Sequence, residues 1–117
     1  MLNAPVIDEQ QIKQFKQDGF LILKNAFNEQ ETADIERWAA ELAAMPEKSG
    51  TQWVFHETSK LDPEESLISR IEYISPFHKG FLELGNVLKK PVAQLLGEEA
   101  VLFKEKINFK NIFMILE

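Results

Sequence analysis

The spacing of apolar and polar residues predicts a short helix near the start of the chain. Asp8 and Gln11 form a capping-box pattern, in which each side chain accepts a hydrogen bond from the backbone amide of the other residue. The residues that follow carry a single apolar stripe, and Gly19 suits the left-handed conformation that ends many helices. We therefore expect a helix over residues 8–18.

A second, longer helix is predicted between Asn28 and Pro46. Asn28 and Glu31 repeat the capping-box pattern, and Pro46 cannot continue a helix because it has no backbone N–H. Between them, apolar residues recur at the spacing of one helix face, namely Ile35, Trp38, Leu42 and Met45. Membership of this stripe places Trp38 in the hydrophobic core rather than in a ligand site.

Several stretches of β-forming residues predict strands. Residues 20–27 (FLILKNAF) are rich in such residues, residues 69–74 (SRIEYI) alternate polar and apolar side chains, and residues 100–110 form a final strand. Residues 53–58 (WVFHET) fit either a short strand or an irregular segment. Trp53 lies in a polar stretch, so it either caps the core or lines the mouth of a pocket.

Shorter helices are expected in the second half of the chain. Residues 62–65 (DPEE) resemble a helix start, with proline at the first helical position and acidic residues facing the positive end of the helix dipole. Residues 81–88 and 91–96 predict two short helices, the second led by Pro91 and closed by Gly97. The mixed order of helices and strands predicts an α+β fold rather than a strict βαβ alternation.

Length and composition indicate one globular domain over residues 1–117, with an atypical apolar tail at residues 112–117. Hydrophobic residues make up 44% of the chain and charged residues 27%, as in a folded protein that stays in solution. The net charge of −6 repels phosphate backbones and anionic lipid, so we expect no nucleic-acid or membrane partner. The chain has no cysteine and no signal-like or membrane-length apolar run, which favours a cytoplasmic location.

Catalytic motifs are scarce. A non-haem iron site needs two imidazoles and a carboxylate, and His-x-Asp on one strand is a compact way to supply two of these ligands. The sequence contains two histidines, His56 and His78, and neither starts a His-x-Asp or His-x-Glu motif. Glu57 would point to the opposite face of a strand from His56. We therefore expect both histidines to pack at the surface or in loops. The sequence also contains no nucleophile elbow and no glycine cluster that could bind phosphate.

Two predicted strands carry cations on one face. Arg70 and Glu72 share the polar face of residues 69–74, and alternation in the final strand separates a polar face from the packing face. The polar face comprises Leu102, Lys104, Lys106, Asn108 and Lys110; the other comprises Phe103, Glu105, Ile107 and Phe109. The polar face is either solvated or, with two cationic strands together, able to bind a small dicarboxylate through charge-assisted hydrogen bonds.

Several segments, in this order along the chain, resemble the phytanoyl-CoA dioxygenase family: FKQDGFLILKNAF, the helix carrying Trp38, SRIEYISPFH, and QLLGEEAVLFKEKINFK. The resemblance extends over about residues 12–110. It implies the N-terminal, incomplete portion of a double-stranded β-helix (jelly-roll, cupin-like) oxygenase that uses Fe(II) and 2-oxoglutarate to hydroxylate a small-molecule substrate. It further implies that Arg70 extends a basic side chain toward 2-oxoglutarate and that Lys106 and Asn108 line the same cosubstrate cavity.

In the family, the iron-binding His-x-Asp follows the strand that KEKINFK resembles, whereas this sequence continues with IFMILE. We therefore expect a truncated dioxygenase that binds no Fe(II) or 2-oxoglutarate by itself and is inactive alone. Two alternatives remain: a non-catalytic binding or assembly protein on the same scaffold, and an enzyme of another class built on His56, Glu57 and Arg70. The apolar, weakly charged stretch INFKNIFMIL predicts self-association through the C-terminal strand.

Overall fold

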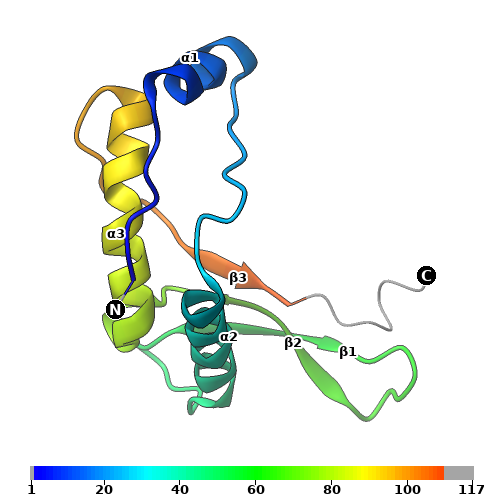
Figure 1. Cartoon of the computed structure of the whole chain (residues 1–117). Helices are drawn as coiled ribbons and strands as arrows, with labels where there is room; N and C mark the ends of the chain where they lie inside the picture. The colour runs from blue at the N-terminus through cyan, green and yellow to red at the C-terminus, as the bar shows by residue number, and fades with distance from the viewer. Residues whose placement is uncertain (1, 110–117) are drawn as a thin grey trace.

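The computed structural model describes residues 2–109, which form an α+β fold of helices and one three-stranded antiparallel sheet (Figure 1). The helices are α1 (Glu9–Asp18), α2 (Glu29–Ala44), the 3₁₀ helix η1 (Ser75–Phe77) and α3 (Lys79–Leu96). The strands are β1 (Trp53–Thr58), β2 (Ser66–Glu72) and β3 (Lys106–Asn108), in the order β1-β2-β3. The predicted α+β class is confirmed.

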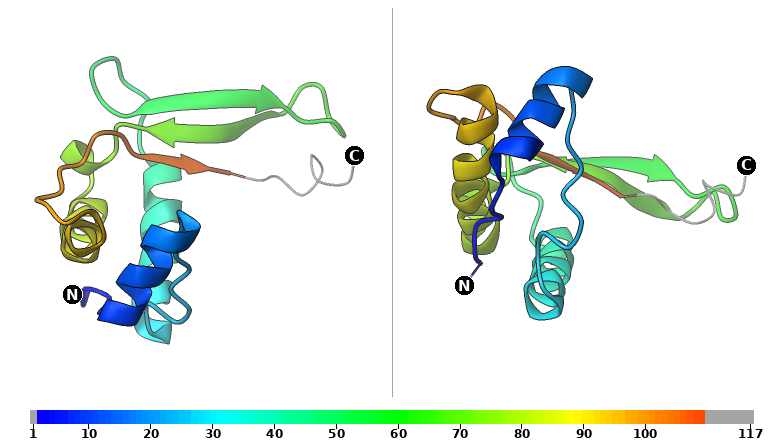
Figure 2. Two further views of the ribbon diagram at one scale, coloured as in Figure 1. Left: turned by 90° about the horizontal axis from the view of Figure 1, so that it is seen from above. Right: turned by 45° about the horizontal axis from the view of Figure 1, so that its top comes forward.

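The hydrophobic core lies between one face of the sheet and helices α2 and α3, which occupy the same side of the sheet (Figure 2). Its buried members are Leu42 from α2, Ile71 and Ile74 from β2 and the turn after it, and Phe81 from α3. Trp38 is half-buried and packs against this cluster, as its helical stripe predicted. No helix within residues 2–109 covers the opposite face of the sheet, which carries the polar residues discussed below (Figure 2).

The first two helices begin where their capping boxes predicted. Asp8 and Gln11 exchange side-chain and backbone hydrogen bonds of 2.8 and 2.9 Å, and Gly19 ends α1 at a φ of 83°. Asn28 and Glu31 form the corresponding box at the start of α2. Local hydrogen bonding alone therefore fixes these boundaries.

The strand predicted over residues 20–27 is wrong. These residues follow an extended path and a turn between α1 and α2, and Asn25 adopts a left-handed φ of 55°, which interrupts a strand. Phe20 and Ile22 are largely exposed. The segment is rich in β-forming residues but pairs with none of the three strands, and β propensity becomes a strand only when a partner supplies the hydrogen bonds.

The helix predicted to start at residues 62–65 is also wrong, because these residues form the turn that joins β1 to β2. The Ser59 amide donates to the Glu65 carbonyl at 2.9 Å, and the Glu65 amide donates to the Asp62 carbonyl at 3.0 Å. The Asp62 side chain accepts from the Glu64 amide at 3.0 Å, a local bond typical of an Asx turn.

Residues 81–88 and 91–96 form one helix, α3, rather than the two that were predicted. Pro91 lies inside it and is buried. The covered residues recur at steps of three and four across the proline, at Phe81, Leu84, Leu88, Pro91 and Leu95. Continuous packing of this stripe outweighs the one backbone hydrogen bond that proline removes.

The final strand is much shorter than predicted, covering Lys106–Asn108 rather than residues 100–110. β3 pairs with β2 from Asn108 opposite Arg70 to Lys106 opposite Glu72, where β2 ends. Residues 100–105 therefore have no strand beside them. Ile107 and Phe109 pack on the core as expected, whereas Phe103, assigned to the same packing face, is 96% exposed.

The predicted apolar tail at 112–117 lies outside the described residues, as does most of the stretch expected to mediate self-association. In residues 2–109, none of the helices has the length and apolar character needed to cross a bilayer.

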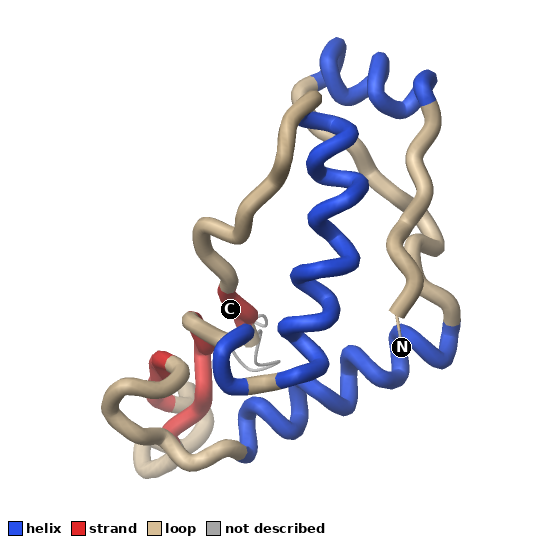
Figure 3. The backbone as a smooth tube through the Cα atoms, turned by 90° about the vertical axis from the view of Figure 1, so that its left-hand side faces the viewer, coloured by secondary structure: helices blue, strands red, loops and turns tan. Residues whose placement is uncertain are grey.

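Two carboxylates hold the N-terminal segment, which leads into α1 (Figure 3). The Leu2 amide donates to Glu83 Oε1 of α3 at 2.6 Å, and the Asn3 amide donates to Glu31 Oε2 of α2 at 2.7 Å. Leu2 and Ile7 are buried. The segment thus bridges the two long helices through Glu83 and Glu31, and Glu31 also caps its own helix.

The double role of Glu31 predicts a pH-dependent contact. Hydrogen bonds from the backbone amides of Asn28 and then Asn3 lower the pKa of Glu31 below its ordinary value of 4.5. The stabilisation that the ionised Glu31 carboxylate gives through these bonds is therefore complete above pH 4.5, and it is lost as the pH falls through the lowered pKa. NMR titration should show the Asn3 and Asn28 amide shifts moving together with a midpoint below 4.5.

Glu31→Gln should abolish that transition, whereas Glu29→Gln, at an exposed acidic position in the same helical turn, should leave it intact. A midpoint at or above 4.5 in the unsubstituted protein would contradict the assigned contacts.

Candidate functional site

The three residues predicted to line a cosubstrate cavity are brought together on one face of the sheet. Arg70 of β2 stands directly opposite Asn108 of β3, and Lys106 stands opposite Glu72. Between them Ile71 pairs with Ile107 on the core side. Alternation along both strands therefore aims Arg70, Lys106 and Asn108 away from the core, toward the uncovered face.

Arg70 is held in place by two neighbours on that face. Its guanidinium carbon lies 4.2 Å from the centre of the Phe55 ring, a cation–π contact, and Phe55 is its cross-strand partner on β1. Its Nε lies 2.8 Å from Glu72 Oε2, although the N–H is not aligned as a hydrogen bond, so this contact is ionic. Among the described residues, no partner is found for the two Nη atoms, which form the outer edge of the guanidinium fork.

Glu72 is the acidic centre of this face. Its side chain is only 8% exposed and it also contacts Lys104, whose Nζ lies 3.2 Å from Oε1. One carboxylate thus joins a cation from β2 to a cation from the segment before β3. The sequence placed Glu72 beside Arg70 on a polar face but gave no signal that Lys104 would reach it, because that contact depends on the β2–β3 register.

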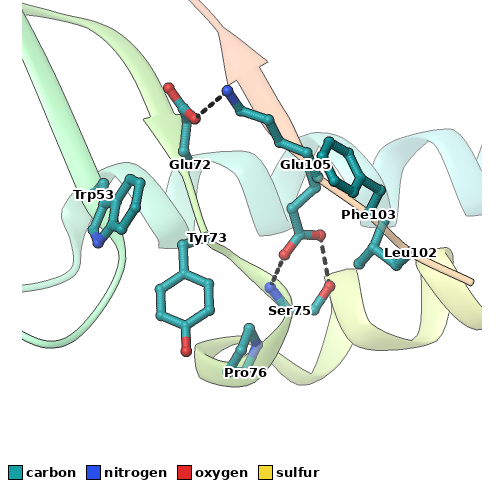
Figure 4. Close-up of a pocket in the computed structure, with 9 residues that line it drawn as sticks. Trp53, Glu72, Tyr73, Ser75, Pro76, Leu102, Phe103 and Glu105 are labelled. Atoms are coloured by element: carbon teal, nitrogen blue, oxygen red, sulfur yellow. Dashed lines mark hydrogen bonds and ion pairs between the residues drawn. The ribbon is translucent and has the colours of Figure 1, made fainter.

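A pocket of about 520 Å³ opens next to Glu72 (Figure 4). Trp53 and Tyr73 stand on one side of it and Leu102 and Phe103 on the other. The remaining lining residues are Glu72, Ser75, Pro76, Lys104 and Glu105. Trp53 thus takes the second of its two predicted roles, at the mouth of a pocket. The volume lies within the range of small-molecule sites.

Tyr73 occupies an unusual backbone conformation, with a φ of 61° immediately after β2 ends. A left-handed φ is a clear outlier for a bulky residue, and such outliers gather at functional sites. The Tyr73 ring lies between Trp53 and Phe77, with centroid distances of 5.9 and 5.2 Å. Nothing in the sequence distinguishes this tyrosine, because backbone strain leaves no residue-type signature here.

Glu105 fixes the other side of the pocket. Its carboxylate accepts hydrogen bonds from the Ile74 amide at 2.7 Å, the Ser75 hydroxyl at 2.6 Å and the Ser75 amide. These bonds attach the segment before β3 to the start of η1 (Figure 4). Sequence reasoning assigned Glu105 only to the packing face of a long strand and missed this role.

The two histidines have separate local partners. His56 on β1 lies 2.6 Å from Glu47 and 3.2 Å from the Ser66 hydroxyl. His78 caps α3 through Nδ1, which accepts from the Gly80 and Phe81 amides, while Nε2 lies 3.2 Å from Glu41. Within residues 2–109, no three His, Cys, Asp or Glu side chains come together as metal ligands would.

Two characterised proteins are similar to this chain. A 2-aminoethylphosphonate dioxygenase from the uncultured bacterium HF130_AEPn_1 is 41% identical over 104 residues, which is 87% of this chain and 39% of that protein. A methylphosphonate hydroxylase from Gimesia maris is 33% identical over 111 residues, which is 93% of this chain and 41% of that protein. The chain therefore spans about two-fifths of the length of these relatives. No protein-family model matches the chain, and no solved structure matches it.

Proposed function

We propose that this chain is part of an oxygenase that hydroxylates a small organophosphonate with 2-oxoglutarate as cosubstrate. The names of both relatives describe oxygenation of a phosphonate, and their similarity extends over most of this chain. Because the chain matches only two-fifths of each relative, the proposal concerns the complete enzyme that carries this sequence.

The fold proposed for that enzyme is the double-stranded β-helix of the phytanoyl-CoA dioxygenase family. Residues 1–117 would supply one N-terminal unit: the helical layer and the first antiparallel strands. An uncovered sheet face beside two helices is compatible with this arrangement, since a β-helix needs a second sheet to enclose its site.

The observation that carries the proposal is the pairing of Arg70 with Asn108 and the position of Lys106 on the same face. An arginine fork binds a carboxylate through two parallel hydrogen bonds, and a neighbouring lysine adds charge without fixed geometry. Contacts with Phe55 and Glu72 orient the guanidinium while leaving its Nη edge for a ligand. We assign one carboxylate of 2-oxoglutarate to this edge, with Lys106 and Asn108 lining the same space.

The Fe(II) that the family resemblance implies has no fitting donor set in the part of the chain that the structure describes. No step of the reaction is therefore assigned to iron held by these residues. The role proposed for residues 2–109 is to bind and orient the organic anions.

Arg70→Ala should weaken 2-oxoglutarate binding in the complete enzyme by about 10- to 100-fold, because hydrogen bonds to charged groups are worth about 1.5–3 kcal/mol. Arg70→Lys should recover only part of this loss, since lysine keeps the charge but not the fork. Binding is measured directly by calorimetry and compared with the cosubstrate KM.

Arg37→Ala provides the matched control, because Arg37 lies on α2 and its ion-pair partners among residues 2–109 are acidic residues of its own helix. An Arg70→Ala protein that folds normally and binds 2-oxoglutarate with unchanged affinity would rule out the assigned site.

A further inference from the structure

The pocket beside Glu72 contains an open aromatic corner. The ring centroids of Trp53 and Tyr73 lie 5.9 Å apart with their planes tilted by 50°, so the two rings form adjoining walls rather than a closed stack. Trp53 is 57% exposed and Tyr73 is 48% exposed, and both line the pocket. Part of their surface is therefore available to a ligand. Aromatic faces arranged in this way attract a cationic group, with tryptophan the strongest.

The strained backbone of Tyr73 is a second, independent observation. A φ of 61° would be relaxed in glycine and strained in tyrosine, so the large ring at this position is kept at a cost in backbone strain. Phe77 meets the Tyr73 ring edge-on, with planes at 81°, and keeps it turned toward Trp53. A strained residue that completes a pocket wall indicates a ligand-binding role.

Charge in the pocket fits a zwitterion. Glu72 and Glu105 place two carboxylates on its lining, and Lys104 places one ammonium there. Both carboxylates already have partners in the protein. They would therefore attract a ligand cation by long-range electrostatics, while the rings of Trp53 and Tyr73 contact it directly. Lys104 is 62% exposed and can turn toward an anionic group.

We propose that Trp53 and Tyr73 determine specificity by binding the ammonium group of an aminoalkylphosphonate, with Lys104 beside the phosphonate. This proposal rests on the proposed function and names the chemical group by which the substrate is selected. The two rings would favour substrates that carry an ammonium at the end opposite phosphorus over plain alkylphosphonates of the same size.

The test compares 2-aminoethylphosphonate with propylphosphonate, in which a methyl group replaces the ammonium. The complete enzyme should prefer the amine in kcat/KM by about 10-fold, as expected for a partly desolvated cation–π contact. Trp53→Leu and Tyr73→Gly should each lower kcat/KM for 2-aminoethylphosphonate much more than for propylphosphonate, and so remove most of this preference. Binding of 2-aminoethylphosphonate should also change Trp53 fluorescence, and Trp38→Phe identifies that signal by removing the other tryptophan.

The unfolding midpoint of Tyr73→Gly separates a binding role from a structural one, since relief of backbone strain offsets part of the packing that is lost with the ring. Phe20→Leu is the control, since Phe20 is an exposed aromatic residue outside the pocket. Equal use of the two phosphonates by the unsubstituted enzyme, or a preference that survives both pocket substitutions, would overturn this inference and leave the proposed function standing. Failure to oxidise any phosphonate would overturn both.

Discussion

Gly80→Ala is expected to lower the free energy of unfolding by about 3 kcal/mol or more, a large part of the roughly 5–15 kcal/mol that holds a domain of this size together. A Cβ atom at Gly80 would lie 2.5 Å from Cε2 and 2.8 Å from Cε3 of the Trp38 ring, far inside van der Waals contact. The ring cannot simply move aside, because His78 and Phe81 pack around it with centroid distances of 6.2 and 6.1 Å. The close approach of α2 to α3 therefore requires glycine.

Gly85→Ala is the matched control from the same helix. A Cβ atom there would meet only the Ser75 hydroxyl, at an ordinary distance of 3.9 Å, so alanine should stabilise α3 by about 0.5–1 kcal/mol. Urea unfolding of both variants gives the two free energies. Combining Gly80→Ala with Trp38→Ala should cost less than the sum of the single changes, since the clash disappears. Equal stabilities of the two glycine variants would refute the packing argument.

The features that could be predicted from the sequence depend on local hydrogen bonding and spacing. The capping boxes at Asp8 and Asn28 involve residues three positions apart, so the helix starts were predictable without knowledge of the rest of the fold. The stripe containing Trp38 and Leu42 likewise predicted which face of α2 packs on the core.

The features that were mispredicted depend on partners distant in the sequence. Residues 20–27 have strand-forming side chains but no strand beside them. Residues 100–105 have no partner strand because β2 ends at Glu72. Pro91 was taken as a helix start because its burial within a continuous stripe is visible only when α3 is packed. In each case tertiary contacts override a local preference.

The candidate site likewise has features that the sequence predicted and features that only the folded chain shows. Alternation predicted a shared face for Lys106 and Asn108, and the sheet brings Arg70 to it. The pocket, in contrast, depends on the strained backbone of Tyr73 and on the long-range bonds of Glu105, neither of which has a sequence pattern. A periodic signal can identify a polar face, but only the folded chain shows what that face surrounds.

Glu105→Ala is expected to lower the free energy of unfolding by about 3 kcal/mol, because it removes a charged acceptor and leaves backbone donors without a partner. The Ile74 and Ser75 amides both donate to this carboxylate, and both residues are buried, so water cannot easily replace it. The segment carrying Leu102 and Phe103 should then detach from η1 and open the pocket wall opposite Trp53 (Figure 4).

Two further variants separate this effect from a general loss of acidic charge. Glu105→Gln keeps a carbonyl oxygen that can accept from the backbone amides but loses the charge and one acceptor, so its stability should be intermediate. Glu99→Ala removes an exposed acid from the preceding loop and should change stability by less than about 0.5 kcal/mol. Urea unfolding ranks the three proteins, and Trp53 fluorescence reports the pocket wall. If Glu105→Ala is as stable as Glu99→Ala, the carboxylate does not hold the segment before β3 against η1, and the pocket needs another support.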